Sequence, residues 1–152
     1  MEKENIKIVT TNRKAHFNYF LSDYLECGIS LLGSEIKSLR NNHCSIDDSY
    51  CLIKNNECFI INMNIPEYDK STVFNHDPLR SRKLLLHKIE ILKLNNKIIK
   101  EGYTLIPTKI YFHKGLAKVE IALAKGKKLY DKRETIKNRD IERDLKKKLK
   151  NY

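Results

Sequence analysis

The sequence predicts a mainly β protein, a small antiparallel barrel or curled sheet with modest helices and a basic C-terminal tail. Two pairs of alternating segments flank short turn sequences, which is typical of β-hairpins. A chain of 152 residues with 41% hydrophobic residues suits one domain with a core. The alternation stops after Leu123, where charged residues take over. We therefore expect a barrel domain over residues 12–124, a loose lead-in over residues 1–11 and a tail over residues 125–152.

The first predicted elements are a strand and a short helix. Residues 19–32 are rich in aromatic and branched side chains, which favours a strand, and Gly28 suggests a bulge or bend within it. Residues 34–40 have helical spacing, and Ser34 can serve as their N-cap. A short helix should therefore follow the strand.

Residues 49–54 and 57–65 form the first predicted hairpin. Asn55 and Asn56 stand between the two arms, and asparagine tolerates the positive φ that a tight turn requires. The polar stretch that follows is typical of a loop, and a short strand is expected over residues 84–86.

A second helix should begin after His87. Glu90 lies three residues later and completes a capping pattern, and the apolar stripe of this helix ends near Gly102. Residues 103–112 and 116–123 then form the clearest predicted hairpin.

The second arm of that hairpin has two unlike faces. Val119, Ile121 and Leu123 share one face, while Lys118 and Glu120 share the other. One face can therefore belong to the core while the opposite face meets a ligand.

Positive charge is concentrated in the tail. From Lys125 onward the chain has twelve Lys or Arg and five Asp or Glu, so the tail carries +7 of the net charge of +11. Cationic side chains displace the counterions condensed around nucleic acids, so the tail predicts a polyanion partner and salt-sensitive binding. A solvated tail that only aids solubility is the plain alternative. Because the stretch has few apolar residues, we expect it to order only on a partner.

The composition also indicates the cellular setting. No apolar run approaches the roughly twenty residues of a membrane helix, and the N-terminus lacks the pattern of a signal peptide. We therefore expect a cytoplasmic protein. The four cysteines include no Cys-x-x-Cys pair, so they are expected to be small core residues in a reducing compartment rather than zinc ligands.

Candidate catalytic residues are scattered along the chain. Asp47 and Asp48 could hold a metal together with Glu26 or Glu35, which would suit a metal-dependent nuclease. A polar turn with surface acids explains them more simply. No glycine-rich phosphate loop is present. We therefore expect neither an enzyme nor a cofactor.

An RNA-binding function explains more of the residues. The cations outside the tail are Arg13, Lys14, Arg40, Arg80, Arg82, Lys83 and Lys118. The aromatic side chains that could stack on unpaired bases are Tyr19, Tyr111, Phe112 and Tyr130. Tyr130 has the least apolar surroundings and is the strongest stacking candidate.

Five segments of the chain resemble the SmpB family of tmRNA-binding proteins, also called SsrA-binding proteins. In the family's order, they are residues 12–15, 33–40, 48–50, 74–87 and 122–134. The most specific parts are residues 77–86 and 125–133. His16 and Phe17 depart from the family pattern, in which Arg followed by His is usual.

The resemblance implies a six-stranded antiparallel barrel like the oligonucleotide-binding (OB) fold, with about three short helices and a tail that is unstructured until it meets the ribosome. It also implies a protein that is not an enzyme and that binds the tRNA-like domain of alanyl-tmRNA. Together with elongation factor Tu, such a protein brings tmRNA to a ribosome stalled on a broken message. Trans-translation then adds a degradation tag to the unfinished peptide.

The resemblance also implies the contact residues. Glu26, Leu85 and Lys118 match family residues that contact tmRNA, and Arg13 and Lys14 are further RNA-binding candidates. The tail residues that match those at the ribosomal decoding centre, facing small-subunit rRNA, are Gly126, Lys127, Lys128, Tyr130, Asp131, Lys132 and Arg133. The following segment would form a helix in the empty mRNA channel. The alternative left open is another small basic RNA-binding barrel, such as a ribosomal or RNA-maturation protein, with the nuclease a distant third.

Overall fold

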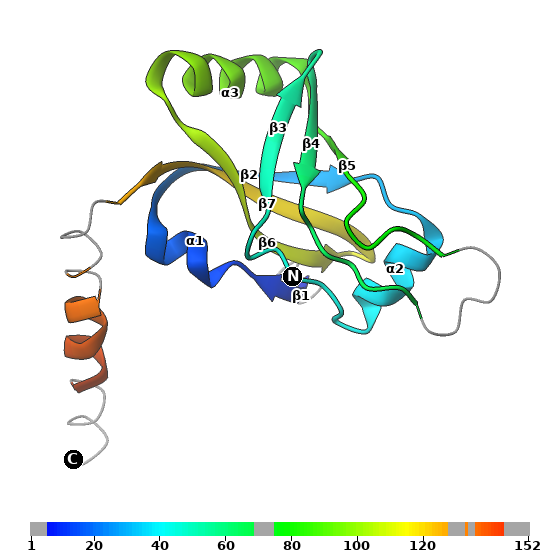
Figure 1. The fold of residues 1–152 in the computed structure, drawn as a ribbon, viewed down its shortest axis with the longest axis horizontal. Coiled ribbons are helices and arrows are strands. Elements are labelled where there is room, and N and C mark those ends of the chain that lie inside the picture. The colour runs from blue at the N-terminus through cyan, green and yellow to red at the C-terminus, as the bar shows by residue number, and fades with distance from the viewer. Residues whose placement is uncertain (1–5, 69–74, 128–132, 134–135, 145–152) are drawn as a thin grey trace.

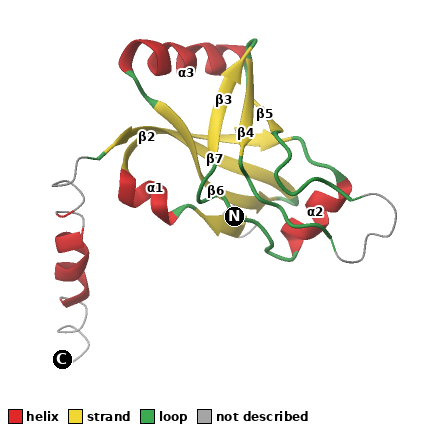
Figure 2. Cartoon of the chain, in the orientation of Figure 1, coloured by secondary structure: helices red, strands yellow, loops and turns green. Residues whose placement is uncertain are grey.

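The computed structural model describes residues 6–68, 75–127, 133 and 136–144. Figures 1 and 2 show a strongly curved sheet with helices around it. The elements are β1 (Ile6–Thr11), α1 (Arg13–Asn18), β2 (Tyr19–Ile29), α2 (Gly33–Arg40), β3 (Tyr50–Lys54), β4 (Glu57–Ile61), β5 (Arg82–Leu85), α3 (Lys88–Glu101), β6 (Thr104–His113) and β7 (Leu116–Gly126).

The strands close into a ring. The seven-stranded sheet has the order β1-β6-β3-β4-β5-β2-β7, and β7 also pairs with β6. Six strands therefore complete a barrel, and β1 is added at the free part of the β6 edge, where Ile8 pairs with Tyr111. The predicted six-stranded antiparallel barrel is confirmed, with one strand more than expected.

The barrel interior is the hydrophobic core. Val119, Ile121 and Leu123 are fully buried there, which confirms the core face predicted for β7. On the opposite face of β7, Ala124 is also buried, because α1 covers it through Ala15. Only the part of β7 nearer to the β6–β7 turn is therefore open to a ligand.

The predicted turn between β3 and β4 and the predicted ends of α3 are confirmed. Asn55 and Asn56 have φ of 53° and 61°, the conformation of a tight hairpin turn between β3 and β4. The backbone N–H of His87 donates to Glu90 Oε1 at 3.0 Å at the start of α3. Gly102, with φ of 72°, ends that helix in the left-handed region.

Three local predictions are wrong. Residues 6–11 of the expected lead-in form β1, because the edge of β6 supplies hydrogen-bond partners that no local pattern reveals. The irregularity in β2 lies between Ser22 and Leu25 rather than at Gly28, which pairs regularly on both sides. Ser34 does not cap α2: its hydroxyl bonds to His76 Nδ1 at 2.8 Å, and Leu32 is the N-cap.

None of the helices in the described residues is both long and apolar enough to cross a membrane. The four cysteines are free thiols, and three of them are buried. In the described part of the chain, no three His, Cys, Asp or Glu side chains are grouped as metal ligands, and Asp48 instead lies 3.7 Å from Lys14 Nζ.

Candidate nucleic-acid interface

Three of the predicted contact residues meet on the outer face of the barrel. Gly28 of β2 pairs with Leu85 of β5 on one side and with Lys118 of β7 on the other. Glu26 lies two residues before Gly28, so its side chain points to the same face of the sheet. We call the surface formed by Glu26, Gly28, Leu85 and Lys118 the Gly28 face.

The Gly28 face combines an apolar side chain with one of each charge. The Leu85 side chain is 54% exposed, which is unusual for a leucine in a strand. Among the residues that the structure describes, no carboxylate lies within salt-bridge distance of Lys118. The lysine is therefore available for a phosphate, and the leucine for a base.

Tyr111 holds the carboxylate of the Gly28 face in place. Its hydroxyl donates to Glu26 Oε2, and His113 Nδ1 lies 3.8 Å from the same oxygen. Burial and the hydrogen bond to Glu26 raise the pKa of Tyr111, so the phenol keeps its proton and remains a donor. The side chain of Glu26 is still 44% exposed, so the carboxylate can also accept hydrogen bonds from RNA.

This role of Tyr111 differs from the prediction. Tyr111 and Phe112 were candidate stacking platforms, but both are buried. Tyr111 pairs with Lys118 across β6 and β7 and therefore points to the outer face, where Lys109 lies over its ring. Its position opposite Lys118 could have been inferred from the alternation of the hairpin, but its bond to Glu26 depends on β2, which is distant in sequence.

Leu85 is positioned by a buried ion cluster. Glu35 and Arg82 have fully buried side chains and form a salt bridge. Arg80 adds a second guanidinium, whose Nη2 lies 2.6 Å from Glu35 Oε1. Arg82 Nη1 also donates to the carbonyl of Met63 at 2.6 Å, so the start of β5 is tied to α2 and to the segment after β4.

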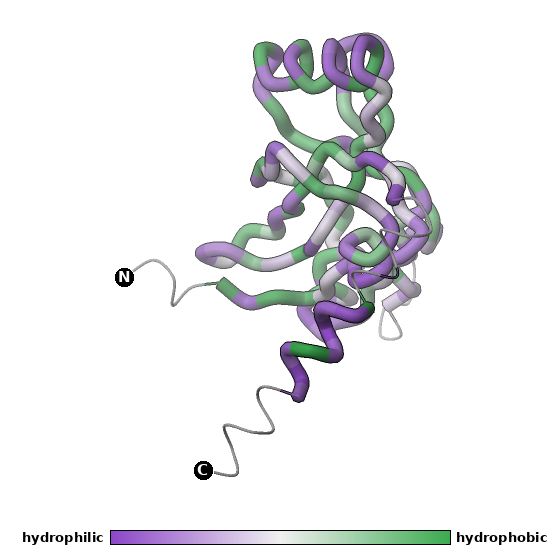
Figure 3. The backbone as a smooth tube through the Cα atoms, turned by 90° about the vertical axis from the view of Figure 1, so that its left-hand side faces the viewer, coloured by the Kyte–Doolittle hydropathy of each residue, from purple (hydrophilic) through white to green (hydrophobic). Residues whose placement is uncertain are grey.

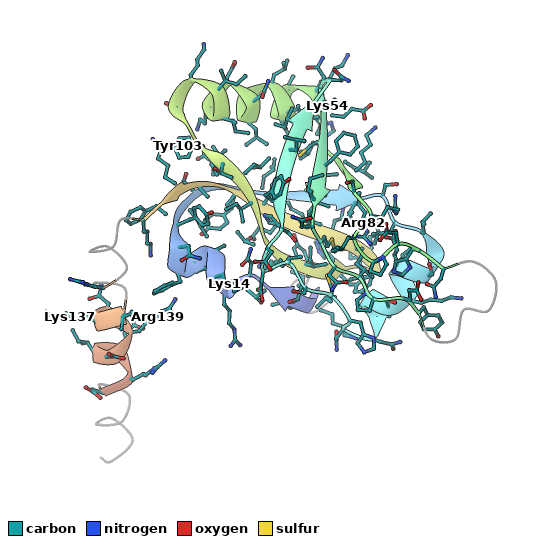
Figure 4. All side chains as sticks on the ribbon, in the orientation of Figure 1. Lys14, Lys54, Arg82, Tyr103, Lys137 and Arg139 are labelled. Atoms are coloured by element: carbon teal, nitrogen blue, oxygen red, sulfur yellow. The ribbon has the colours of Figure 1, made fainter. Side chains whose placement is uncertain are left out.

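Arg82 is therefore not an RNA contact, contrary to the prediction. Its side chain is fully buried, and Figure 4 marks its position among the side chains between β5 and α2. Burial alone would raise the pKa of Glu35, but hydrogen bonds from Arg80, the Leu32 N–H and Arg82 outweigh it and lower the pKa below its ordinary value of 4.5. The cluster is a charged structural support for the strand that carries Leu85.

Arg13 and Lys14 belong to a different part of the surface. They lie in α1, whose N-cap Asn12 is buried and accepts the N–H of Ala15 at 3.1 Å. α1 lies just before the start of β2, whereas Gly28 lies near the end of that strand. Up to about 30 Å of β2 therefore separates α1 from the Gly28 face. The structure does not bring these cations to the Gly28 face.

The start of the tail lies beside α1. Strand β7 continues to Gly126, two residues beyond the predicted end of the barrel domain. The backbone N–H of Lys127 donates to the Asn18 carbonyl at 2.8 Å, and its Nζ donates to the carbonyl of His16 at 3.2 Å. We call α1 with Gly126 and Lys127 the tail end of the barrel; Figure 1 shows it on the left.

Part of the predicted decoding-centre group lies outside the described residues, namely Lys128, Tyr130, Asp131 and Lys132. Arg133 is helical and exposed, and residues 136–144 form a helix with every residue exposed. Figure 3 shows this helix as mostly hydrophilic. The helix contacts α1 through Arg139, whose guanidinium carbon lies 5.8 Å from the centroid of the Phe17 ring.

The charge of the tail is uneven. Residues 136–144 contain three cations and three carboxylates, so the helix is neutral, while residues 125–133 and 146–150 each carry +4. Opposite charges three residues apart, such as Asp140 and Arg143, support a helix without an apolar core. Most of the attraction to a polyanion should therefore come from the two basic segments that flank the helix.

Comparisons with known proteins agree with these features. The family model described as SmpB protein matches residues 9–151. An SsrA-binding protein of Caldanaerobacter subterraneus subsp. tengcongensis is 53% identical over 149 residues, covering 98% of this chain and 94% of that protein. One of Acholeplasma laidlawii is 52% identical over 145 residues, covering 95% of this chain and 97% of that protein.

A solved structure is also similar. It is described as "tmRNA-SmpB: a journey to the center of the bacterial ribosome". The matched chain superposes with a TM-score of 0.66 and 42% sequence identity, covering 79% of this chain and 85% of that chain.

Proposed function

The chain belongs to the SmpB protein family, and on that premise we propose that it binds tmRNA and is required for trans-translation on stalled ribosomes. The observation that carries this proposal is the match of the family model to residues 9–151, which includes both the barrel and the tail. In this proposal the protein itself catalyses no reaction: it neither forms nor breaks a covalent bond. Its task is to recognise one RNA and to place it on the ribosome, in the cytoplasm.

The Gly28 face is the proposed contact for the tRNA-like domain of tmRNA. Its exposed leucine, lysine and oriented carboxylate offer an apolar surface, a phosphate partner and a hydrogen-bond acceptor for base amino or ribose hydroxyl groups. A carboxylate would repel phosphates in a purely electrostatic site. Its presence therefore favours recognition of particular RNA groups over binding to any polyanion.

The tail end of the barrel is the proposed contact for the ribosome. Arg13 and Lys14 lie beside the point where the tail leaves β7, so they are suited to the same rRNA surface as the tail rather than to tmRNA. We place residues 126–133 at the decoding centre and the following helix in the empty mRNA channel. Alanyl-tmRNA would arrive with elongation factor Tu.

A reconstituted translation reaction on an mRNA without a stop codon tests the proposal. With tmRNA present, the tagged peptide should appear only when this protein is added. A protein ending after Lys127 should still bind the tRNA-like domain but give no tagged peptide, because β7 is complete at Gly126 and the tail is missing. Tagging without the protein, or equal loss of binding and tagging in the shortened chain, would contradict the proposal.

A further inference from the structure

A small hollow opens beside Gly28, Leu85 and Lys118 of the Gly28 face and extends toward α2. It opens between the end of β2, the β6–β7 turn and α2. The larger apolar side chains that line it include Leu31, Ile36, Leu85, Phe112 and Leu116, and the cations beside it are Arg40 and Lys118. We propose that this hollow holds one unpaired nucleobase of the bound RNA.

The size of the hollow suits a single base. Its volume is about 280 Å³, at the lower limit of pockets that bind small molecules, which begin at roughly 300 Å³. A flat group such as one nucleobase fits such a space, whereas a run of stacked nucleotides does not. Leu116 is 63% exposed and Leu85 54% exposed, so both would gain by packing against the faces of a base.

Gly28 keeps the hollow open. A Cβ atom at this position would lie 3.3 Å from Leu85 Cδ1, tighter than ordinary van der Waals contact. Gly28 is not among the glycines with positive φ, so its backbone conformation does not require glycine. The absence of a side chain is explained instead by the space that it leaves beside Leu85.

Arg40 provides a stacking surface at the edge of the hollow. Its guanidinium carbon lies 5.3 Å from the centroid of the Phe112 ring, and that ring is buried. The ring fixes one face of the guanidinium, while the exposed arginine can stack its other face on a base. Lys118 can then neutralise the adjoining phosphate. An apolar hollow with two cations matches a nucleotide better than it matches an apolar peptide.

This inference rests on the proposed function, because the hollow shares Leu85 and Lys118 with the proposed tmRNA contact. It adds Arg40 and Leu116 to that contact and gives Gly28 a reason to lack a side chain. In this inference the residues of the hollow bind one unpaired nucleobase of the RNA.

The test measures the affinity of four full-length variants for the transcribed tRNA-like domain of tmRNA. Gly28→Val fills the hollow, Arg40→Gln removes the stacking cation, and Arg40→Lys keeps the charge but not the planar group. Lys54→Gln is the control, since this exposed lysine lies away from the hollow (Figure 4). We expect Gly28→Val and Arg40→Gln to weaken binding roughly tenfold or more, Arg40→Lys to weaken it less, and Lys54→Gln to bind like the wild type.

Crosslinking tests the base itself. A photoreactive benzophenone amino acid in place of Leu116 should attach to one unpaired nucleotide, and the adduct should disappear when Gly28→Val is added. Wild-type affinity in both Gly28→Val and Arg40→Gln, or adducts spread over paired stems, would overturn the inference. If Glu26→Ala still weakens binding in that case, the proposed function stands and only the base pocket is refuted. If the wild type shows no preference for tmRNA over an elongator tRNA, both are refuted.

Discussion

Replacing Glu35 by glutamine should destabilise the protein more than any change to a surface ion pair. Glu35 and Arg82 are both fully buried, and Arg82 would keep its charge without the carboxylate that neutralises it. Breaking a buried ion pair by removing one partner costs about 3–5 kcal/mol. Domains of this kind have total unfolding free energies of about 5–15 kcal/mol, so Glu35→Gln should remove a large part of the stability.

Arg80→Gln is the matched control for this prediction. Arg80 bonds to the same carboxylate, but its side chain is 34% exposed, so water can replace the lost contact. Its loss should cost about 1 kcal/mol or less. Urea unfolding followed by circular dichroism gives both values. Equal midpoints for Glu35→Gln and the wild type would refute the view that this cluster supports the barrel.

The pH dependence provides a second readout. The pKa of Glu35 is lowered in the folded state, so its contribution to stability is present above the ordinary value of 4.5 and is lost as the pH falls through the folded pKa. The stability difference between the wild type and Glu35→Gln should therefore shrink as the pH falls below about 4.5. A difference that stays constant down to pH 3 would contradict the assigned charge state.

Three further predictions concern other parts of the molecule. Tyr111→Phe should weaken tmRNA binding severalfold, and its effect should not add to that of Glu26→Ala, because the hydroxyl acts through that carboxylate; additive losses in filter binding would exclude this. A chain ending after Lys127 should show a smaller change of affinity for the ribosome with salt than the full chain, since it lacks most of the cations of the tail; an unchanged salt slope would mean that the tail does not touch rRNA. Burial raises the pKa of the Cys27 thiol to about 12, so it should resist alkylation at pH 8 until urea unfolds the protein, and rapid labelling of the native state would show that the barrel opens.

Much of the fold could be predicted because its signals are local. Asn55 and Asn56 mark a turn that needs positive φ, and Glu90 marks the start of a helix whose end is marked by Gly102. Closure of the ring could not be read in this way, because it depends on pairs of residues distant in sequence, such as Cys51 with Leu105. The strand β1 was missed for the same reason, since it is held by the distant strand β6.

The candidate site was only partly accessible to reasoning from charge. Lys118 could be found, because alternation along β7 puts it opposite the core residues. Arg82 was misassigned, since an arginine in a basic segment is expected at the surface unless its buried partner, Glu35, is known. Glu26 and Leu85 were identified only through the family resemblance, because neither an acid nor a leucine is a usual signal for RNA binding.

The affinity of the purified protein for the tRNA-like domain of tmRNA, measured beside an elongator tRNA of similar length at physiological and at higher salt, tests the central claim most directly. A marked preference for tmRNA that persists as salt rises is expected, because the Gly28 face supplies contacts that salt does not screen. Equal affinities that fall together as salt rises would contradict the claim, since they would leave only a basic tail attached to a barrel.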